Sequence, residues 1–147
     1  MKKIFTLLAV LTIWTGAAKA QEYNWGIGLR GGGIASGLDA RINFDPANSL
    51  EMILSCSQGI SLYGLYERQV PVFARGWTFY YGAGGHAGTW SWGGKNFSVG
   101  VDVIAGLEYA VRKQPVAFSL DYKPVFNFTS KQGFKMADVA ISARYTF

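Results

Sequence analysis

The stretch FSVGVDVIAGLEYAV, from Phe97 to Val111, decides the fold class of this chain. Its odd-numbered positions are all apolar or aromatic, whereas its even-numbered positions include Ser98, Asp102 and Glu108. Successive side chains of a β-strand point to opposite faces, so a strand separates these two sets of residues. A helix, with 3.6 residues per turn, would place Asp102 and Glu108 among the valines. The stretch therefore predicts a strand with one apolar and one polar face.

The same alternation recurs along residues 21–147, and no part of that range has the pattern of a helix. The intervening segments are rich in Gly, Pro, Asn and Ser, which are typical of turns. We expect eight strands in a single domain, at Tyr23–Gly33, Ser36–Phe44, Ser49–Ser57, Ile60–Gln69, Gly76–Gly88, Asn96–Arg112, Pro115–Phe128 and Phe134–Phe147.

Residues 1–20 have the layout of a secretory signal peptide. Lys2 and Lys3 precede the apolar run IFTLLAVLTIW, and the small residues of Ala18-Lys19-Ala20 follow it. The run is shorter than the about 20 residues of a membrane-spanning helix. We therefore expect cleavage before Gln21, export, and a barrel domain over residues 21–147.

Composition narrows the class of protein further. The chain has a formal net charge of +5, but Lys2, Lys3 and Lys19 lie within the expected leader, and the remainder does not predict nucleic-acid binding. Cys56 is the single cysteine, so the exported chain has no internal disulfide. The mean hydropathy of +0.13 is high for an exported soluble domain and low for a helical membrane protein.

Two architectures fit strands with one apolar and one charged face. In a soluble barrel or sandwich the apolar face points inward, whereas in a transmembrane barrel it meets lipid and the charged residues fill the interior. Small residues on the polar face, such as Gly82, Gly84, Gly100 and Gly106, suit a narrow and crowded interior. An even number of strands also allows a sheet to close without a free edge, as lipid requires.

Aromatic residues on the apolar faces form two groups near the strand ends, the layout of two interfacial girdles. One group comprises Tyr23, Trp25, Phe44, Tyr66, Trp77, Tyr109, Tyr145 and Phe147. The other comprises Trp90, Trp92, Phe97, Phe126, Phe128 and Phe134. Together with the alternation, this layout predicts an all-β fold: a closed eight-stranded antiparallel up-and-down transmembrane β-barrel.

The polar faces predict a charged interior. We expect the side chains that fill it to pair across neighbouring strands and to form a packed lumen in place of a pore, because a barrel of this size is filled by its own side chains. A ligand-binding lumen is the alternative. The expected interior network consists of Arg30, Arg41, Glu51, Glu67, Asp102, Glu108, Asp121, Lys123 and Arg144.

Several segments resemble small Gram-negative outer-membrane β-barrel proteins, the eight-stranded class typified by OmpX. The overall sequence pattern resembles even more closely the short "outer membrane protein beta-barrel domain" family. The similarity rests on GLYERQVP (64–71), FYYGAGGHAG (79–88), VGVDVIAGLEYAV (99–111), LDYKPVFNF (120–128) and ARYTF (143–147). It implies location in a bacterial outer membrane, and it implies that Tyr145 and Phe147 form the C-terminal signal recognised by the barrel assembly machinery. It implies no defined activity.

His86 is the one histidine and the one candidate catalytic residue. Barrel enzymes that act on lipid A, of the PagP and PagL types, use a His with a Ser and an acidic residue. The deacylase pattern has a Ser two residues after the His, where this chain has Gly88, although Ser91, Ser98 and Asp102 lie nearby in sequence. A histidine bonded among interior polar groups is the other interpretation, and we favour it.

From these observations we expect a non-enzymatic, monomeric outer-membrane barrel with a role in envelope integrity or surface interaction. Its partners would be outer-membrane lipid, lipopolysaccharide and the assembly machinery, with no cofactor, metal or nucleic acid. A lipid A-modifying enzyme that uses His86 and a soluble lipocalin-like barrel that binds an apolar ligand are the alternatives.

Overall fold

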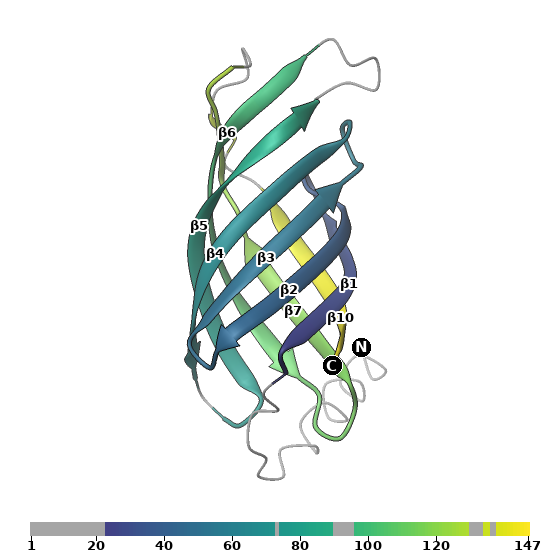
Figure 1. The fold of residues 1–147 in the computed structure, drawn as a ribbon, viewed down its shortest axis with the longest axis vertical. Coiled ribbons are helices and arrows are strands. Elements are labelled where there is room, and N and C mark those ends of the chain that lie inside the picture. Colours follow the sequence, from purple (N-terminus) through teal and green to yellow (C-terminus); the bar gives the residue numbers. More distant parts are fainter. Residues whose placement is uncertain (1–22, 73, 90–95, 130–133, 136–137) are drawn as a thin grey trace, which may run out of the picture.

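The computed structural model describes residues 23–72, 74–89, 96–129, 134–135 and 138–147 (Figure 1). The expected signal peptide, Trp90 and Trp92 lie outside these residues. The described part contains ten strands: β1 (Trp25–Gly32), β2 (Gly37–Asp45), β3 (Asn48–Ser55), β4 (Ser61–Pro71), β5 (Trp77–Thr89), β6 (Phe97–Ala110), β7 (Val116–Tyr122), β8 (Val125–Asn127), β9 (Phe134–Lys135) and β10 (Val139–Thr146). In that part of the chain, no helix is long and apolar enough to cross a membrane.

Eight of the described strands form a closed ring. Each of β1 to β6 pairs antiparallel with the next strand, and β10 closes the ring by pairing with both β7 and β1. Closure between the first and last strands runs from Gly26 opposite Thr146 to Gly32 opposite Ala140. The sequence prediction of a closed eight-stranded antiparallel barrel is thereby confirmed, while its insertion in a membrane stays a prediction.

The seventh and eighth expected strands are each divided in two. The seventh stops at Tyr122 and resumes as β8, with Lys123 and Pro124 between, because proline has no N–H to donate to the ladder. The eighth consists of β9 and β10, and the short pair of β8 with β9 adds to the sheet at the end far from the termini. There β5 and β6 also project beyond the other strands (Figure 1).

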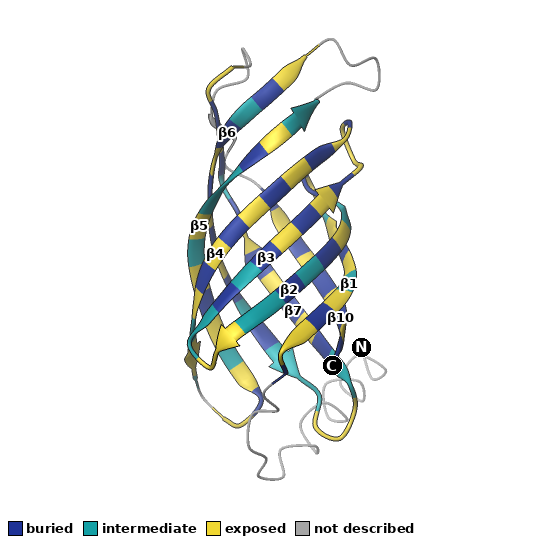
Figure 2. Cartoon of the chain, viewed as in Figure 1, coloured by how far each residue is buried: buried dark blue, intermediate teal, exposed yellow. Residues whose placement is uncertain are grey.

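Burial alternates along the strands, as Figure 2 shows by its bands of buried and exposed residues. In β10 the pattern changes at every residue from Val139 to Thr146. Aliphatic and aromatic side chains point outward, and exposed fractions of 53% for Leu120 and 63% for Ile141 are typical. Apart from Asp45 and Arg68, which lie near strand ends, the described charged side chains of the strands point inward, which is the reverse of a soluble sheet.

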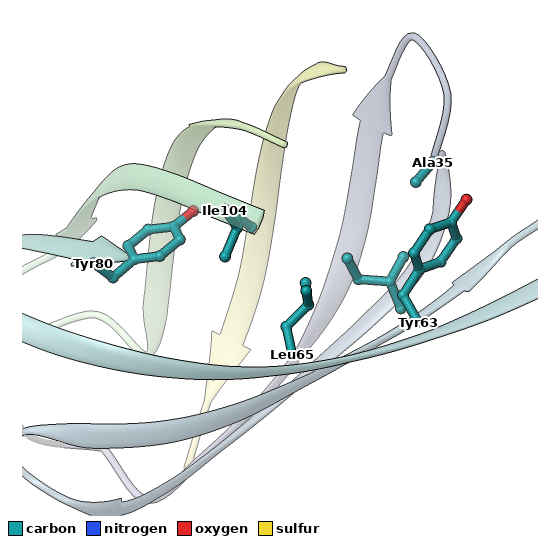
Figure 3. Close-up of a cluster of buried hydrophobic side chains, with 6 residues drawn as sticks. Ala35, Tyr63, Leu65, Tyr80 and Ile104 are labelled. Carbon is teal, nitrogen blue, oxygen red and sulfur yellow. The ribbon is translucent and has the colours of Figure 1, made fainter. Parts of the chain in front are cut away.

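The interior also contains one apolar layer. Its members are fully or almost fully buried and pack together as one cluster, drawn in Figure 3: Ala35, Ile53, Tyr63, Leu65, Tyr80 and Ile104. Glycine makes room beside it, since a Cβ on Gly106 would lie 2.6 Å from Cζ of Tyr80 and 2.6 Å from Cβ of Asp121. The expectation that small residues relieve a crowded interior holds at this position.

Candidate functional site: the charged interior of the barrel

The inward-facing side chains form the candidate site. All nine residues of the expected interior network are buried, each with an exposed fraction of 3% or less. The alternation of the strands explains this placement, because eight of the nine residues occupy inward-facing strand positions. The ninth, Lys123, continues the alternation of β7 one residue beyond its end. The network falls into two parts, one nearer the termini and one nearer the opposite end.

Arg41 on β2 is at the centre of the part nearer the termini. Its Nη1 lies 2.8 Å from Glu108 Oε2, and its Nη2 contacts the carboxylates of Glu51 and Glu67, the latter at 2.8 Å. The guanidinium also lies over the ring of Tyr80, 4.3 Å from its centroid. One cation therefore connects three acidic side chains from three different strands.

Arg144 on β10 complements Arg41. Its Nε lies 2.6 Å from Asp39 Oδ2, its Nη1 lies 2.6 Å from Glu108 Oε2, and its Nη2 lies 3.0 Å from Glu51 Oε2. Nη1 also donates a hydrogen bond to Ser119 Oγ at 3.2 Å. Because Glu51 and Glu108 contact both arginines, the two guanidinium groups and their carboxylates form one connected cluster.

Arg30 on β1 forms the most regular ion pair of the interior. Its Nη1 and Nη2 donate to the two oxygens of Asp121 at 2.7 and 2.6 Å, a bidentate geometry. Tyr80 donates its hydroxyl to the same carboxylate at 3.1 Å. Arg30 Nη2 also lies 3.6 Å from Asp138 Oδ2, which connects this pair to the part of the network far from the termini.

The expectation that interior charges pair across neighbouring strands holds for some of these pairs and is wrong for others. Pairing across neighbouring strands holds for Arg41 with Glu51, which are also opposite each other in the β2–β3 ladder. Arg30 and Asp121, however, lie on β1 and β7, which have β10 between them. In a narrow barrel a long side chain reaches past its neighbour, so the shortest route between opposite charges often crosses the lumen.

Lys123 anchors the part of the network far from the termini. It lies in the break between β7 and β8, and its Nζ is 3.3 Å from Asp138 Oδ2 and 3.6 Å from Asp102 Oδ1. The ammonium also lies over the ring of Tyr63, 4.0 Å from the centroid. This lysine is fully buried, a position that such a cation occupies only with partners of opposite charge.

His86 on β5 belongs to the same part. Its Nδ1 lies 2.7 Å from Asp102 Oδ2, and its Nε2 lies 2.9 Å from Asn127 Oδ1, to which Ser98 donates at 2.7 Å. The imidazole is 4% exposed, and its ring is 5.1 Å from that of Tyr63. In a Ser-His-Asp triad a hydroxyl contacts the nitrogen that faces away from the acid. Among the described residues, the amide of Asn127 occupies that position.

Sequence reasoning missed part of the interior. Asp39 and Asp138 are both fully buried and both lie in ion pairs, yet neither was in the expected network. Both occupy polar-face positions in the alternation of their strands, so the sequence places them on the inward side although the expected network omitted them. Tyr23, expected in a girdle, donates its hydroxyl to Glu108 at 2.7 Å and is 8% exposed.

The aromatic residues expected in the girdles lie mostly on the outer wall near the strand ends. Toward the termini, the rings of Trp77 and Tyr109 lie in tilted contact with their centroids 5.0 Å apart, and those of Tyr145 and Phe147 meet edge to face at the same distance. Trp25 and Phe44 are exposed at that end as well, and Phe97, Phe126 and Phe128 are exposed at the other. Tyr66 differs from the expectation, since it is exposed but is the sixth of the eleven residues of β4.

No group of three or more His, Cys, Asp or Glu side chains in the described part of the chain is arranged to hold a metal ion. Comparison of the chain with models of known protein families and with curated proteins gave no match.

The closed ring, the exposed apolar side chains and the interior ion pairs together define the class of this protein. It is a closed β-barrel with an apolar outer wall and an ion-paired interior.

Proposed function

We propose that this protein is an integral barrel of a bacterial outer membrane, with a non-enzymatic role in envelope integrity or surface interaction. The observation that carries the proposal is the distribution of charge. Of the described residues, the charged side chains that are exposed are Asp45, Arg68, Arg75, Arg112 and Lys113. All five lie in the turns, or near the strand ends, on the side of the termini.

Between the two ends, the described outer wall presents aliphatic and aromatic side chains and no charged one. A wall of this kind in water would expose far more contiguous apolar surface than the few hundred Å² that soluble monomers tolerate. In lipid it is the favourable arrangement, and closure of the ring leaves none of its eight strands at a free edge of the sheet. Strands of seven to fourteen residues in the ring are compatible with the about 9–11 residues of a tilted membrane strand.

A soluble lipocalin-like barrel is a poorer fit to the same observations. Such a barrel takes an apolar ligand inside, where this chain has Arg41, Arg144 and their carboxylate partners in mutual contact. The filled interior also favours a packed lumen over a pore. The structural role that we propose for the network is to fix the register of the strands, since each arginine connects acids on several strands.

For His86 we propose a structural role in place of lipid A chemistry. The imidazole is enclosed by Asp102, Asn127 and Tyr63 inside the barrel, away from the outer wall where a lipid would be presented. The proposed partners are outer-membrane lipid and lipopolysaccharide along the wall. The barrel assembly machinery is a proposed partner of β10, which carries Tyr145 and precedes Phe147 on the outer face.

The experiment that tests the proposal is fractionation of cells that express the full chain, combined with gel electrophoresis of heated and unheated samples. We expect the protein to remain with the outer membrane after a carbonate wash and to change mobility on boiling, as closed membrane barrels do. A protein released by carbonate, with the same mobility in both samples, would refute the proposal.

A further inference from the structure

We propose that the outer wall carries a phospholipid site, in which an apolar groove on β5, β6 and β7 takes an acyl chain and nearby cations take the phosphate. The inference rests on the proposed membrane location and adds a defined ligand to it. Two independent observations carry it: a hollow in the wall, and a concentration of positive charge at the end of the barrel to which that hollow leads.

The groove has a volume of about 530 Å³. Outward-facing side chains line it, chiefly Val72, Phe79, Ala105, Leu107, Leu120 and Tyr122. Its origin is local, because Ala105 pairs with Tyr81 on β5 and with Tyr122 on β7, and its methyl group is far smaller than these two rings. A small residue between large ones leaves a depression, and the volume falls within the range of about 300–1,000 Å³ found for small-ligand sites.

The positive charge lies in the two hairpin loops below the groove. Arg75 is in the loop between β4 and β5, three residues after Val72, which itself lines the groove. Arg112 and Lys113 are in the next loop, between β6 and β7. All three are exposed, and the one exposed acidic side chain of the described residues, Asp45, lies in the separate β2–β3 turn. We call the β4–β5 loop with Arg75 and the β6–β7 loop with Arg112 and Lys113 the basic loops.

The spacing between groove and basic loops suits a phospholipid. Phe79 follows Arg75 by four residues and Leu107 precedes Arg112 by five, which correspond to at most about 13 and 17 Å along the chain at about 3.3 Å per residue. Because strands of a membrane barrel tilt by about 35–45°, these lengths correspond to depths of about 9–14 Å. Half the hydrocarbon core of a bilayer is about 15 Å. A lipid with its phosphate at the basic loops would thus have its acyl chain beside the groove, and arginine and lysine favour an anionic headgroup.

The test uses residues 21–147, the expected mature protein, reconstituted in vesicles of phosphatidylcholine and phosphatidylglycerol. The protein is then extracted from the vesicles with mild detergent. Native mass spectrometry then counts the phospholipid retained per barrel. Ala105→Trp fills the floor of the groove, and Val103→Trp is the matched control, since Val103 points outward on the same strand but lies outside the groove. Retention of the gel shift on boiling shows that each variant has folded.

We expect the wild type and Val103→Trp to retain phosphatidylglycerol in preference to phosphatidylcholine, and Ala105→Trp to lose about tenfold in occupancy. Replacing Arg75 and Lys113 by Gln should abolish the preference for the anionic lipid. Arg68→Gln is the control for charge: Arg68 is an exposed arginine of β4 outside the two loops, with Asn48 and Tyr81 as its ladder partners, and we expect the anionic preference to survive its loss.

Equal retention by the Ala105 and Val103 variants would overturn the inference, as would an anionic preference that survives loss of Arg75 and Lys113. Dimers that cross-link in the wild type and disappear in Ala105→Trp would assign the groove to a second copy of the chain and overturn it too. In each case the barrel would still withstand carbonate and shift on boiling, so failure here is distinguishable from failure of the membrane proposal.

Discussion

Removal of the Arg144 guanidinium should destabilise the barrel by leaving a buried carboxylate without its cation. In Arg144→Met, the carboxylates of Glu51 and Glu108 keep their contacts with Arg41. Asp39 does not, because Arg144 is the one cation within 4 Å of it among the described residues. The substitution therefore leaves one fully buried carboxylate without a partner charge, and we expect a loss of about 3–5 kcal/mol in the free energy of unfolding.

A double-mutant cycle isolates the cause. Asp39→Asn removes the orphaned charge while keeping the shape of the side chain, so the double variant should recover about 1–3 kcal/mol relative to Arg144→Met alone. The exposed Arg68→Met serves as the control and should change stability by no more than about 0.5 kcal/mol. The assay is equilibrium unfolding by denaturant in detergent micelles, followed by tryptophan fluorescence. If Arg144→Met costs less than about 1 kcal/mol, or Asp39→Asn restores nothing, the network is not what fixes these strands.

Three further predictions test other parts of the structure. Gly106→Ala should lower the free energy of unfolding by about 1–3 kcal/mol, because the added methyl group is forced against Tyr80. Gly64→Ala is the control and should be neutral in the same assay, since an added Cβ there has nothing within 4 Å; equal effects would contradict the crowded interior. Val103→Arg, at the seventh of the fourteen residues of β6, should cost about 2–4 kcal/mol in lipid vesicles, and wild-type stability would mean that this face meets water. His86→Ala should lower stability by about 1–3 kcal/mol by orphaning its hydrogen-bond partners, and should leave the lipid A mass profile of expressing cells unchanged; an altered profile would support the enzymatic alternative.

The sequence alone predicted which side of the sheet most of the described strand residues occupy, because parity along a strand requires no knowledge of its neighbours; Tyr23, expected on the outer wall, is the exception. Ile104 and Asp102 were both assigned to the polar side, and both are buried in the interior. The strand count and closure followed from the same pattern. The break at Lys123 was visible only as Pro124 within an otherwise regular strand, and its consequence, a division into β7 and β8, was not anticipated.

Contacts across the lumen could not be predicted in this way. Arg30 and Asp121 are separated by 91 positions in the chain and by an intervening strand in the sheet. Which acid an arginine meets depends on the tilt of the strands and on side-chain length, and neither is encoded in local periodicity. For the same reason, the hollow above Ala105 became apparent only when the flanking tyrosines were placed beside it.

The most direct test of the account is the environment of the outer wall. Nitroxide labels are attached at Val101, Val103, Leu107 and the inward-facing Ile104 in a Cys56→Ser background, and the protein is reconstituted in lipid vesicles. Collision rates with oxygen, which partitions into lipid, and with a water-soluble nickel chelate are then compared by electron paramagnetic resonance. The account predicts that oxygen dominates at the three outward positions and that both collision rates are low at Ile104. Dominance of the nickel chelate at the outward positions would contradict it, because the apolar wall would then face water.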